Sequence, residues 1–405
     1  TGDPKGAMLT HQNIISNIEA CLEILPVGTR HHALSFLPLN HVFERMLNYL
    51  YMSAGLGIYY VENIDTIADD IRKVKPHIFT TVPRLIEKVY EKITEKGEQQ
   101  RGIKRWLFDW SLKLAKNYEL SGNSLWYKLQ HRIADALIYG KWRAALGGEI
   151  ICIVSGGAAL NPTIARAFTA AGIPVLEGYG LTETSPVIAV NRMDEKDRKF
   201  GSVGKVIDNV EVKLGGEDEI LCRGPNIMKG YYNKPEKTEE VIEEDGWFHT
   251  GDIGDIDEEG FLSITDRKKS VFKTSGGKYV APQRVENTFS ESSFIDNIMV
   301  VGEGRKMVTA VIQPNFEKLK SWFEQQNFSW DSKEEAVERK EVREKFEEIV
   351  DECNQGLNHT EQVKEFVLVP DEWTVEGGEL TPTRKLKRRI IEDKYEGEIE
   401  EMYKN

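Results

Sequence analysis

Apolar residues in the first half of the chain alternate between short continuous runs and longer stretches with helical spacing. A continuous run bounded by turn residues predicts a buried strand, and apolar residues three or four apart predict one face of a helix. The runs lie at 33–38, 57–61 and 77–83, and the helical stretches at 8–25, 64–74 and 84–94. Strands that alternate with helices are typical of a mostly parallel sheet covered by helices, so we expect an α/β fold.

Two further runs, at 150–154 and 173–176, are almost entirely apolar, and each is followed by glycines. Ser155-Gly156-Gly157 follows the first run and Glu177-Gly178-Tyr179-Gly180 follows the second. Open α/β sheets hold ligands outside the carboxyl ends of their strands. We therefore predict two glycine-rich turns and a ligand site at this edge of the sheet.

The pattern changes at about Gly201, where short alternating segments broken by glycine predict an antiparallel sheet or a small barrel. A third pattern of short strands and charged helices follows residues 265–269 and predicts a small α+β domain. We expect a large α/β part at 1–200, a β-rich subdomain of the same domain at 201–267, and a mobile α+β lid domain at 268–405.

Composition narrows the class of protein. A chain of 405 residues is too long for one compact core, and its net charge of −13 argues against a nucleic-acid partner. No apolar run approaches the roughly 18 residues that span a bilayer. The four cysteines are scattered without a CxxC pair, which argues against a disulfide framework or a zinc site: Cys21, Cys152, Cys222 and Cys353. We expect a cytoplasmic protein, and its oligomeric state stays open.

Residues 101–143 differ from the rest of this acidic chain. They hold nine Lys or Arg against three Asp or Glu, together with eight aromatic residues. Basic, aromatic, amphipathic helices of this kind can lie in a membrane interface, which would place the protein peripherally at the inner membrane surface. The other interpretation is a helical pair that packs its aromatic residues onto the domain and leaves its lysines in water. Composition leaves both interpretations open.

Two short motifs contain groups suited to binding phosphates. Thr1-Gly2-Asp3-Pro4-Lys5-Gly6 is a small turn with bare amides and one mobile cation. Residues 178–184 place an aromatic ring between two glycines, where it can offer a flat face to a purine. In the same motif Thr182 offers a hydroxyl to a phosphate and Glu183 offers a hard carboxylate to Mg²⁺.

A third motif, residues 246–252, ends in Asp252, a carboxylate that can accept hydrogen bonds from ribose hydroxyls. Arg267, fifteen residues further on, could add a second contact to ribose or phosphate. His249 in this motif is expected to support the turn that presents the carboxylate. Each of the three motifs alone is more often an ordinary turn, and the sequence holds no Ser/His/Asp constellation and no His/Cys metal cluster.

Together and in this order, the motifs resemble the adenylate-forming superfamily of acyl-CoA synthetases, nonribosomal-peptide adenylation domains and luciferases. The chain is most similar to long-chain fatty acid–CoA ligases in 38–45, in the aromatic insert at 101–143 and in its final motif. That family's phosphate loop begins several residues earlier, so we expect an amino-terminally truncated chain. The matching stretches are TGDPKG (1–6), GYGLTET (178–184), GWFHTGD (246–252), TDRKKSVFKTSGGKYVAP (265–282) and LTPTRKLKRR (380–389).

The resemblance implies binding sites for ATP, Mg²⁺ and coenzyme A. The implied nucleotide residues are Thr1, Gly2, Lys5 and Gly6 for the β- and γ-phosphates, Gly156, Gly157, Ala158, Glu177, Gly178, Tyr179 and Gly180 for the adenine, Thr182 for a phosphate, Glu183 for Mg²⁺, and Asp252 and Arg267 for the ribose.

The resemblance also implies a reaction in two steps. Lys385 matches the family's catalytic lysine, with Lys387 as the fallback, and would act when the fatty carboxylate attacks ATP. Gly276 and Gly277 would meet the pantetheine of coenzyme A in the second step. Lys269 falls at the family's hinge position, and rotation about it would exchange the lysine for the glycine loop.

His41 has two interpretations, a residue that gates the acyl channel or orients the carboxylate, and a structural histidine. The implied reaction converts a long-chain fatty acid, ATP and coenzyme A to acyl-CoA, AMP and pyrophosphate. One alternative is an adenylating ligase for a medium-chain, aryl or amino acid. The other is an inactive fragment that binds only nucleotide or membrane.

Overall fold

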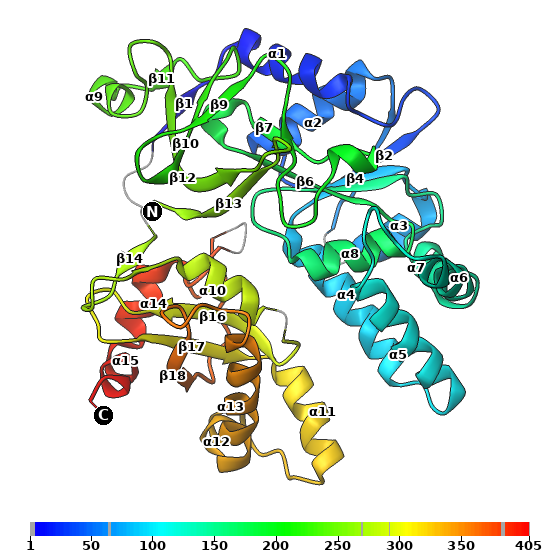
Figure 1. Cartoon of the computed structure of the whole chain (residues 1–405), viewed down its shortest axis with the longest axis vertical. Helices are drawn as coiled ribbons and strands as arrows, with labels where there is room; N and C mark the ends of the chain where they lie inside the picture. Colours follow the sequence, from blue (N-terminus) through cyan, green and yellow to red (C-terminus); the bar gives the residue numbers. More distant parts are fainter. Residues whose placement is uncertain (1–4, 64–65, 269, 291, 382–384, 405) are drawn as a thin grey trace. The chain divides into compact units, whose positions relative to one another are not determined.

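The computed structural model describes residues 5–63, 66–268, 270–290, 292–381 and 385–404. The chain divides into two compact units, residues 4–264 and residues 265–405, each with its own hydrophobic cores (Figure 1). A search of the described residues finds no helix that is long and apolar enough to cross a membrane.

The first unit is built on a seven-stranded sheet in the order β3-β2-β4-β5-β6-β7-β8. The five strands from β3 to β6 in this order are parallel, and β7 and β8 continue the sheet in antiparallel pairing. The strands are β2 (His32–Ser35), β3 (Gly57–Tyr60), β4 (Ile78–Thr81), β5 (Cys152–Ser155), β6 (Val175–Gly180), β7 (Val187–Val190) and β8 (Lys205–Val206).

Helices cover both faces of this sheet because successive strand residues point to opposite sides. Ile78 and Cys152 belong to one core, and the adjacent Phe79 and Ile153 belong to another. Helices α1 (His11–Leu22) and α2 (Val42–Ser53) contribute to the first core. The second core is closed by α3 (Ile67–Val74), α4 (Pro83–Glu98), α5 (Ile103–Lys116), α6 (Leu125–Ala134), α7 (Gly140–Ala145) and α8 (Pro162–Ala170).

The β-rich part of the first unit is an open sheet in the order β13-β12-β10-β9, and β10 pairs antiparallel with both of its neighbours. A short ribbon joins β1 to β11. These elements are β1 (Ala7–Met8), β9 (Glu211–Leu214), β10 (Glu219–Arg223), β11 (Gly230–Tyr231), α9 (Pro235–Glu239), β12 (Phe248–Ile256) and β13 (Leu262–Arg267), whose residues 265–267 belong to the second unit.

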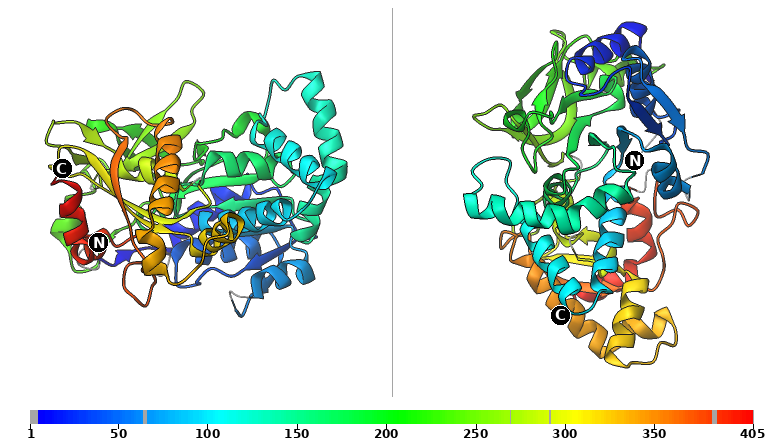
Figure 2. Two further views of the ribbon diagram at one scale, coloured as in Figure 1. Left: turned by 90° about the horizontal axis from the view of Figure 1, so that it is seen from below. Right: turned by 90° about the vertical axis from the view of Figure 1, so that its right-hand side faces the viewer.

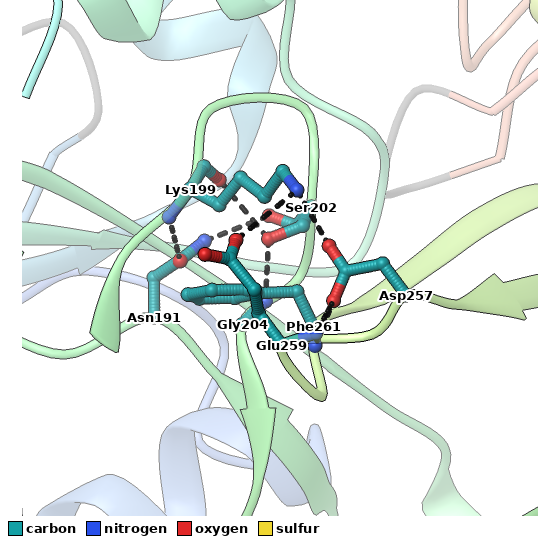
Figure 3. Close-up of polar contacts among 7 residues, drawn as sticks. All are labelled: Asn191, Lys199, Ser202, Gly204, Asp257, Glu259 and Phe261. Atoms are coloured by element: carbon teal, nitrogen blue, oxygen red, sulfur yellow. Dashed lines mark hydrogen bonds and ion pairs between the residues drawn. The ribbon is translucent and has the colours of Figure 1, made fainter. Parts of the chain in front are cut away.

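The segment between β7 and β8 ties this open sheet to the large one (Figure 3). The amide of Lys199 donates to Asn191 Oδ1 at 2.9 Å, and Asn191 Nδ2 donates to the carbonyl of Ser202 at 2.7 Å. The ammonium of Lys199 forms an ion pair of 2.5 Å with Asp257, in the turn between β12 and β13. Val203 and Gly204 exchange backbone hydrogen bonds of 2.9 Å with Leu262. These hydrogen bonds and this ion pair therefore connect the two sheets.

The second unit contains a three-stranded mixed sheet in the order β16-β17-β18 and a two-stranded ribbon of β14 and β15. Neighbouring residues on the sheet again enter different cores, as Ile298 and Met299 do. Arg388 donates to the half-buried Glu286 at 2.6 Å and so attaches the final motif of the sequence to α10. The elements are β14 (Phe272–Lys273), β15 (Tyr279–Val280), α10 (Pro282–Phe289), β16 (Ile295–Val301), β17 (Val308–Pro314), α11 (Phe316–Gln326), α12 (Lys333–Glu338), α13 (Lys340–Asn354), β18 (Val363–Leu368), α14 (Arg388–Lys394) and α15 (Glu396–Met402).

The predicted fold class is confirmed: a mostly parallel sheet covered by helices, a β-rich part, and an α+β unit at the C-terminal end. Of the two arrangements that we expect for the β-rich part, an antiparallel sheet or a small barrel, the structure has the sheet, because β13 and β9 form its open edges. The exact domain bounds that we expect from the sequence, 200/201 and 267/268, stay predictions.

Candidate functional site

Gly156 follows β5 directly and packs closely against β4 and Phe43. Ser155, the last residue of β5, lies opposite Thr81 in β4, and the amide of Gly156 donates to the carbonyl of Thr81 at 3.1 Å. A Cβ atom at Gly156 would lie 2.9 Å from the ring of Phe43. A side chain at this position would force the ring of Phe43 to shift, because the ring already occupies that space. Gly157 and Ala158, which follow, are exposed.

The segment Glu177-Gly178-Tyr179-Gly180 is strand, which corrects the predicted turn. Strand β6 continues to Gly180 because β7 pairs with it, Tyr179 opposite Ala189. A Cβ atom at Gly180 would lie 1.8 Å from the carbonyl oxygen of Pro186. Gly180 therefore allows close strand pairing, and the ring of Tyr179 extends from a fixed strand rather than from a loop.

Tyr179 and Asp252 lie together, as expected for an adenine and ribose site. The phenol of Tyr179 donates to Asp252 Oδ2 at 2.7 Å. Burial, and then the negative charge of Asp252, raise the pKa of Tyr179, so the phenol keeps its proton. Two predicted nucleotide residues from different sheets thus share one hydrogen bond.

The segment Thr250-Gly251-Asp252 is also strand rather than a turn. It lies within β12, opposite a register shift between Glu219 and Leu221 of β10, and Gly251 has a φ of +73°. The amide of Gly251 donates to Glu219 Oε1 at 3.1 Å. A β-bulge of this kind re-aims a side chain, here the buried carboxylate of Asp252.

His249 supports this bulge, in agreement with the structural role that we expect from its motif. Its Nδ1 lies 3.1 Å from Glu219 Oε2 and its Nε2 lies 2.8 Å from Glu243 Oε1. Burial alone would lower the pKa of His249, but the two carboxylates outweigh it and raise that pKa. His249 and Glu219 therefore form a polar support beneath the amide of Gly251.

Lys5 and Glu183 both contact the side chain of Tyr231. Ala7 of β1 pairs with Tyr231 of β11, which brings the ammonium of Lys5 to 4.4 Å from the centre of the Tyr231 ring. The phenol of Tyr231 donates to Glu183 Oε1 at 2.9 Å. Gly6 lies in the same ribbon, where its carbonyl accepts from the amide of residue 232. Thr1 and Gly2, the other predicted residues of this loop, lie outside the described residues.

Tyr231 is the residue that sequence reasoning missed. Its contacts depend on the pairing of β1 with β11, and each of these strands has only two residues. A two-residue strand has no measurable hydrophobic period, so no pattern in the sequence could reveal this pairing.

Thr182 and Glu183 begin a short 3₁₀ turn, Thr182–Thr184, directly after β6. Thr182 is exposed and Glu183 is half-buried. The backbone carbonyl of Glu183 accepts from the amide of Met228 at 2.8 Å, which fixes the turn. In the described part of the chain no three His, Cys, Asp or Glu residues gather as a metal site. A single carboxylate fits Mg²⁺, since this ion usually keeps several waters and binds substrate phosphates.

Glu177 is buried, and its environment favours the neutral acid. Burial raises the pKa of Glu177 to about 8, against the opposing hydrogen bond from the backbone of Leu160. At pH 7 this carboxyl can therefore keep a proton and donate a hydrogen bond, which a carboxylate cannot do.

His41 occupies the N-cap position of α2. Its Nδ1 accepts from the amide of Phe43 at 3.3 Å, and the ring of Phe43 in turn faces Gly156. This contact gives His41 a structural role at the edge of the site. The catalytic role that we expect from the sequence stays a prediction.

The remaining predicted residues belong to the second unit. Arg267 is the last residue of β13 and is exposed. Gly276 and Gly277 form the turn between β14 and β15, where Gly277 has a φ of +76°. The amide of Thr381 donates to the carbonyl of Lys385 at 2.8 Å, and the side chain of Lys385 is exposed. Lys269 lies outside the described residues.

Two family models match the chain. One, described as AMP-binding enzyme, covers residues 1–232, and the other, AMP-binding enzyme C-terminal domain, covers residues 269–405. The "Long-chain-fatty-acid--CoA ligase FadD15" of Mycobacterium bovis is 32% identical over all of this chain and 68% of its own length. The "Long-chain-fatty-acid--CoA ligase 5" of Rattus norvegicus is 35% identical over all of this chain and 61% of its own length.

Solved structures share the fold at lower identity. The adenylation domain of a carboxylate reductase from Mycobacterium chelonae has a TM-score of 0.76 and 22% identity, over 100% of this chain and 58% of that one. The o-succinylbenzoate CoA synthetase of Bacillus subtilis, in complex with an acyl-adenylate intermediate, has a TM-score of 0.68 and 20% identity, over 97% of this chain and 67% of that one. The chain spans about three fifths to two thirds of the length of the curated relatives named above. By its matches to both family models and to full-chain relatives, the protein belongs to the family of AMP-binding enzymes.

Proposed function

We propose that the chain activates long-chain fatty acids by way of an acyl-adenylate, as an AMP-forming acid–thiol ligase. The relatives that match its whole length at 32–35% identity are named long-chain-fatty-acid–CoA ligases. These names do not favour a medium-chain, aryl or amino acid substrate. Solved structures of the same fold hold ATP, an acyl-adenylate or AMP.

The observation that carries this proposal is the contact of Lys5 and Glu183 with the same side chain, Tyr231. A cation and a hard carboxylate in one place suit a polyphosphate and its counter-ion. The bonded pair of Tyr179 and Asp252 supplies a flat ring and ribose acceptors for the rest of a nucleotide.

In the first step, a carboxylate oxygen of the fatty acid forms a bond to the α-phosphorus of ATP, and the bond to pyrophosphate breaks. Two anions approach each other, so positioning and charge neutralisation dominate the catalysis. The ammonium of Lys385 would neutralise charge that gathers between the carboxylate and the phosphate. Thr182 would donate to a phosphate oxygen, and Mg²⁺ on Glu183 would neutralise phosphate charge when bound.

In the second step, the thiolate of coenzyme A attacks the acyl carbonyl carbon, and AMP leaves. Gly276 and Gly277 would allow the pantetheine to pass close to the backbone, because neither residue carries a Cβ atom. Lys385 and these glycines belong to the same unit, so we propose that the unit presents each in turn about Lys269.

We also propose that the chain contacts a membrane surface peripherally through residues 101–143. A long-chain fatty acid is amphiphilic and partitions into bilayers, so an enzyme at the surface meets a concentrated substrate. The excess of cations in this segment supports the proposal.

A pyrophosphate-exchange assay with a panel of acids tests the proposed reaction. We expect exchange with long-chain fatty acids and little with aryl or amino acids. Asp252→Ala should raise the apparent KM for ATP roughly tenfold or more, because a charged hydrogen-bond acceptor is lost. Asp245→Ala, an exposed acid of the neighbouring turn, is the control and should leave KM unchanged. Magnesium ATP binding by calorimetry without exchange for any acid would favour the inactive fragment instead.

A further inference from the structure

Helices α5 and α6 expose an unusual concentration of large apolar side chains. Figures 1 and 2 show both helices, α5 in cyan and α6 in blue-green, as outer helices of the first unit. In the described part of the chain, seven of the seventeen exposed large apolar residues fall between 103 and 137. The exposed fraction reaches 86% for Leu125 and 69% for Trp126. Scattered exposed apolar residues are normal in proteins, but a cluster of them marks an interaction surface.

On α6 the exposed residues form one stripe. Leu125, Trp126, Leu129 and Ile133 lie within an arc of roughly 100° at helical spacing. Leu137 extends the stripe into the π-helical turn Asp135–Tyr139. The opposite side of α6 faces the protein, where the phenol of Tyr127 donates to the carbonyl of Leu114 at 2.8 Å. The stripe therefore faces away from the core that the helix helps to cover.

Tryptophans of α5 extend this stripe to a second helix. Trp106 and Trp110 are stacked with ring centroids 6.3 Å apart. Trp110 Nε1 donates to Gln130 Oε1 at 3.2 Å, and Gln130 lies one turn beyond Trp126 on α6. We name the exposed apolar residues of these two helices and the turn that follows them the α5–α6 face, and it consists of Ile103, Trp106, Leu125, Trp126, Leu129, Ile133 and Leu137.

The charges of residues 101–143 that lie outside ion pairs are positive. All three acidic residues of 101–143 are paired, Asp109 with Arg105, Asp135 with Arg143, and Glu119 with Arg166. Within the described ranges, the other seven basic residues of the segment form no ion pair: Arg101, Lys104, Lys113, Lys116, Lys128, Arg132 and Lys141. On α6, Lys128 and Arg132 lie beside the apolar stripe at helical spacing.

We propose that the α5–α6 face docks on the surface of a bilayer that contains anionic lipids. The inference deepens the proposed membrane contact and rests on it. Apolar side chains of such a face enter the boundary between headgroups and acyl chains, while the surrounding cations attract anionic headgroups. A second copy of the chain is a poorer occupant, because the unpaired cations of both copies would then face each other.

Flotation with lipid vesicles tests the docking surface. We expect the chain to float with vesicles of phosphatidylcholine and phosphatidylglycerol, and much less with phosphatidylcholine alone or at high salt. Trp126→Ser with Leu129→Ser should weaken binding roughly tenfold or more. The matched control, Ile15→Ser with Met52→Ser, removes exposed apolar groups elsewhere on the same unit and should bind as the unchanged chain does.

A second set of variants separates the charges from the apolar stripe. Lys104, Lys128 and Arg132 changed together to Gln should abolish the preference for anionic vesicles, whereas Lys73, Lys92 and Lys96 changed to Gln should preserve it. Equal binding by both sets, or a dimer that the Trp126→Ser and Leu129→Ser change dissolves, would overturn the docking surface. Pyrophosphate exchange with detergent-dispersed fatty acid should be the same for every variant, so a failed flotation test is distinguishable from a failed ligase proposal.

Discussion

At the scale of single residues, Glu44 is a buried acid without a role in the proposed reaction. It lies in 38–45, the stretch that resembles long-chain ligases, and is 2% exposed. Its carboxylate bonds with the hydroxyl of Ser35 and accepts from Asn48 Nδ2 at 3.3 Å. Burial raises the pKa of Glu44 to about 7, and these hydrogen bonds oppose the rise without cancelling it.

Glu44 should make the stability of the chain depend on pH. Its folded-state pKa lies above its unfolded value, so its favourable contribution is complete below about pH 4.5 and is lost as the pH rises through 7. Glu44→Gln removes the titrating group. Its free energy of unfolding should therefore rise, relative to that of the unchanged chain, by up to roughly 3 kcal/mol between pH 5 and pH 8. Urea unfolding of both proteins at these two pH values measures the difference.

The control for this change is Glu95→Gln, at an exposed position of α4. Its free energy of unfolding should follow that of the unchanged chain at both pH values. A difference between Glu44→Gln and the unchanged chain that stays constant with pH would contradict the buried, titrating acid.

The sequence indicates candidate site residues by their chemical groups, but it does not reveal the contacts among them. The sequence alone indicated Lys5, Tyr179, Glu183 and Asp252 because each offers a chemical group that a nucleotide requires. It could not indicate Tyr231, which joins two of these groups, because that contact arises from strand pairing between distant parts of the chain.

At the scale of elements, the two sheets of the first unit depend on a glycine between β7 and β8. Gly204 has a φ of +86°, and a Cβ atom there would lie 2.1 Å from the amide nitrogen of Asn191. No side chain fits at this distance, because the nearest atoms belong to the backbone of Val190 and Asn191, which cannot move aside as a side chain can. The hydrogen bond from the amide of Leu262 to the carbonyl of Gly204 therefore depends on the absence of a Cβ atom.

Gly204→Ala should destabilise the first unit beyond the strain of its backbone conformation. The left-handed conformation alone costs roughly 1–2 kcal/mol with alanine, and the backbone clash should add at least roughly 2 kcal/mol. Gly148→Ala isolates the first contribution, because Gly148 has a φ of +85° and nothing within 4 Å of its missing Cβ atom. Thermal unfolding of both variants checks this, and equal losses of stability would refute the close approach.

The elements also show where sequence patterns fail. Apolar runs found the parallel strands of the first unit, and helical spacing found α1, α3 and α4, because burial imposes those periods. Helical spacing did not predict α2 or α8. The segments 178–180 and 250–252 were expected as turns, since glycine usually marks one. They are strands, because β7 and β10 pair with them, and pairing between distant segments leaves no local signal.

At the scale of the whole molecule, the predicted chemistry is divided between two compact units. Tyr179, Asp252, Lys5 and Glu183 belong to residues 4–264, whereas Lys385 belongs to residues 265–405. Resemblance to a family supplied the role of Lys385, because its surroundings, a run of basic residues, would otherwise indicate an ordinary solvated surface. The proposed reaction therefore requires both units, and removal of one lysine can separate its two steps.

Lys385→Ala should abolish formation of the acyl-adenylate and spare the second step. Loss of a cation that stabilises developing charge should slow fatty-acid-dependent pyrophosphate exchange roughly a hundredfold or more. Thioester formation from supplied acyl-adenylate and coenzyme A should stay near the rate of the unchanged chain, because charge no longer gathers at the α-phosphate. Lys387→Ala is the matched control two residues away and should leave both rates intact. If instead Lys385→Ala impaired the thioester step, or Lys387→Ala impaired the first, the assignment of the catalytic lysine would be wrong.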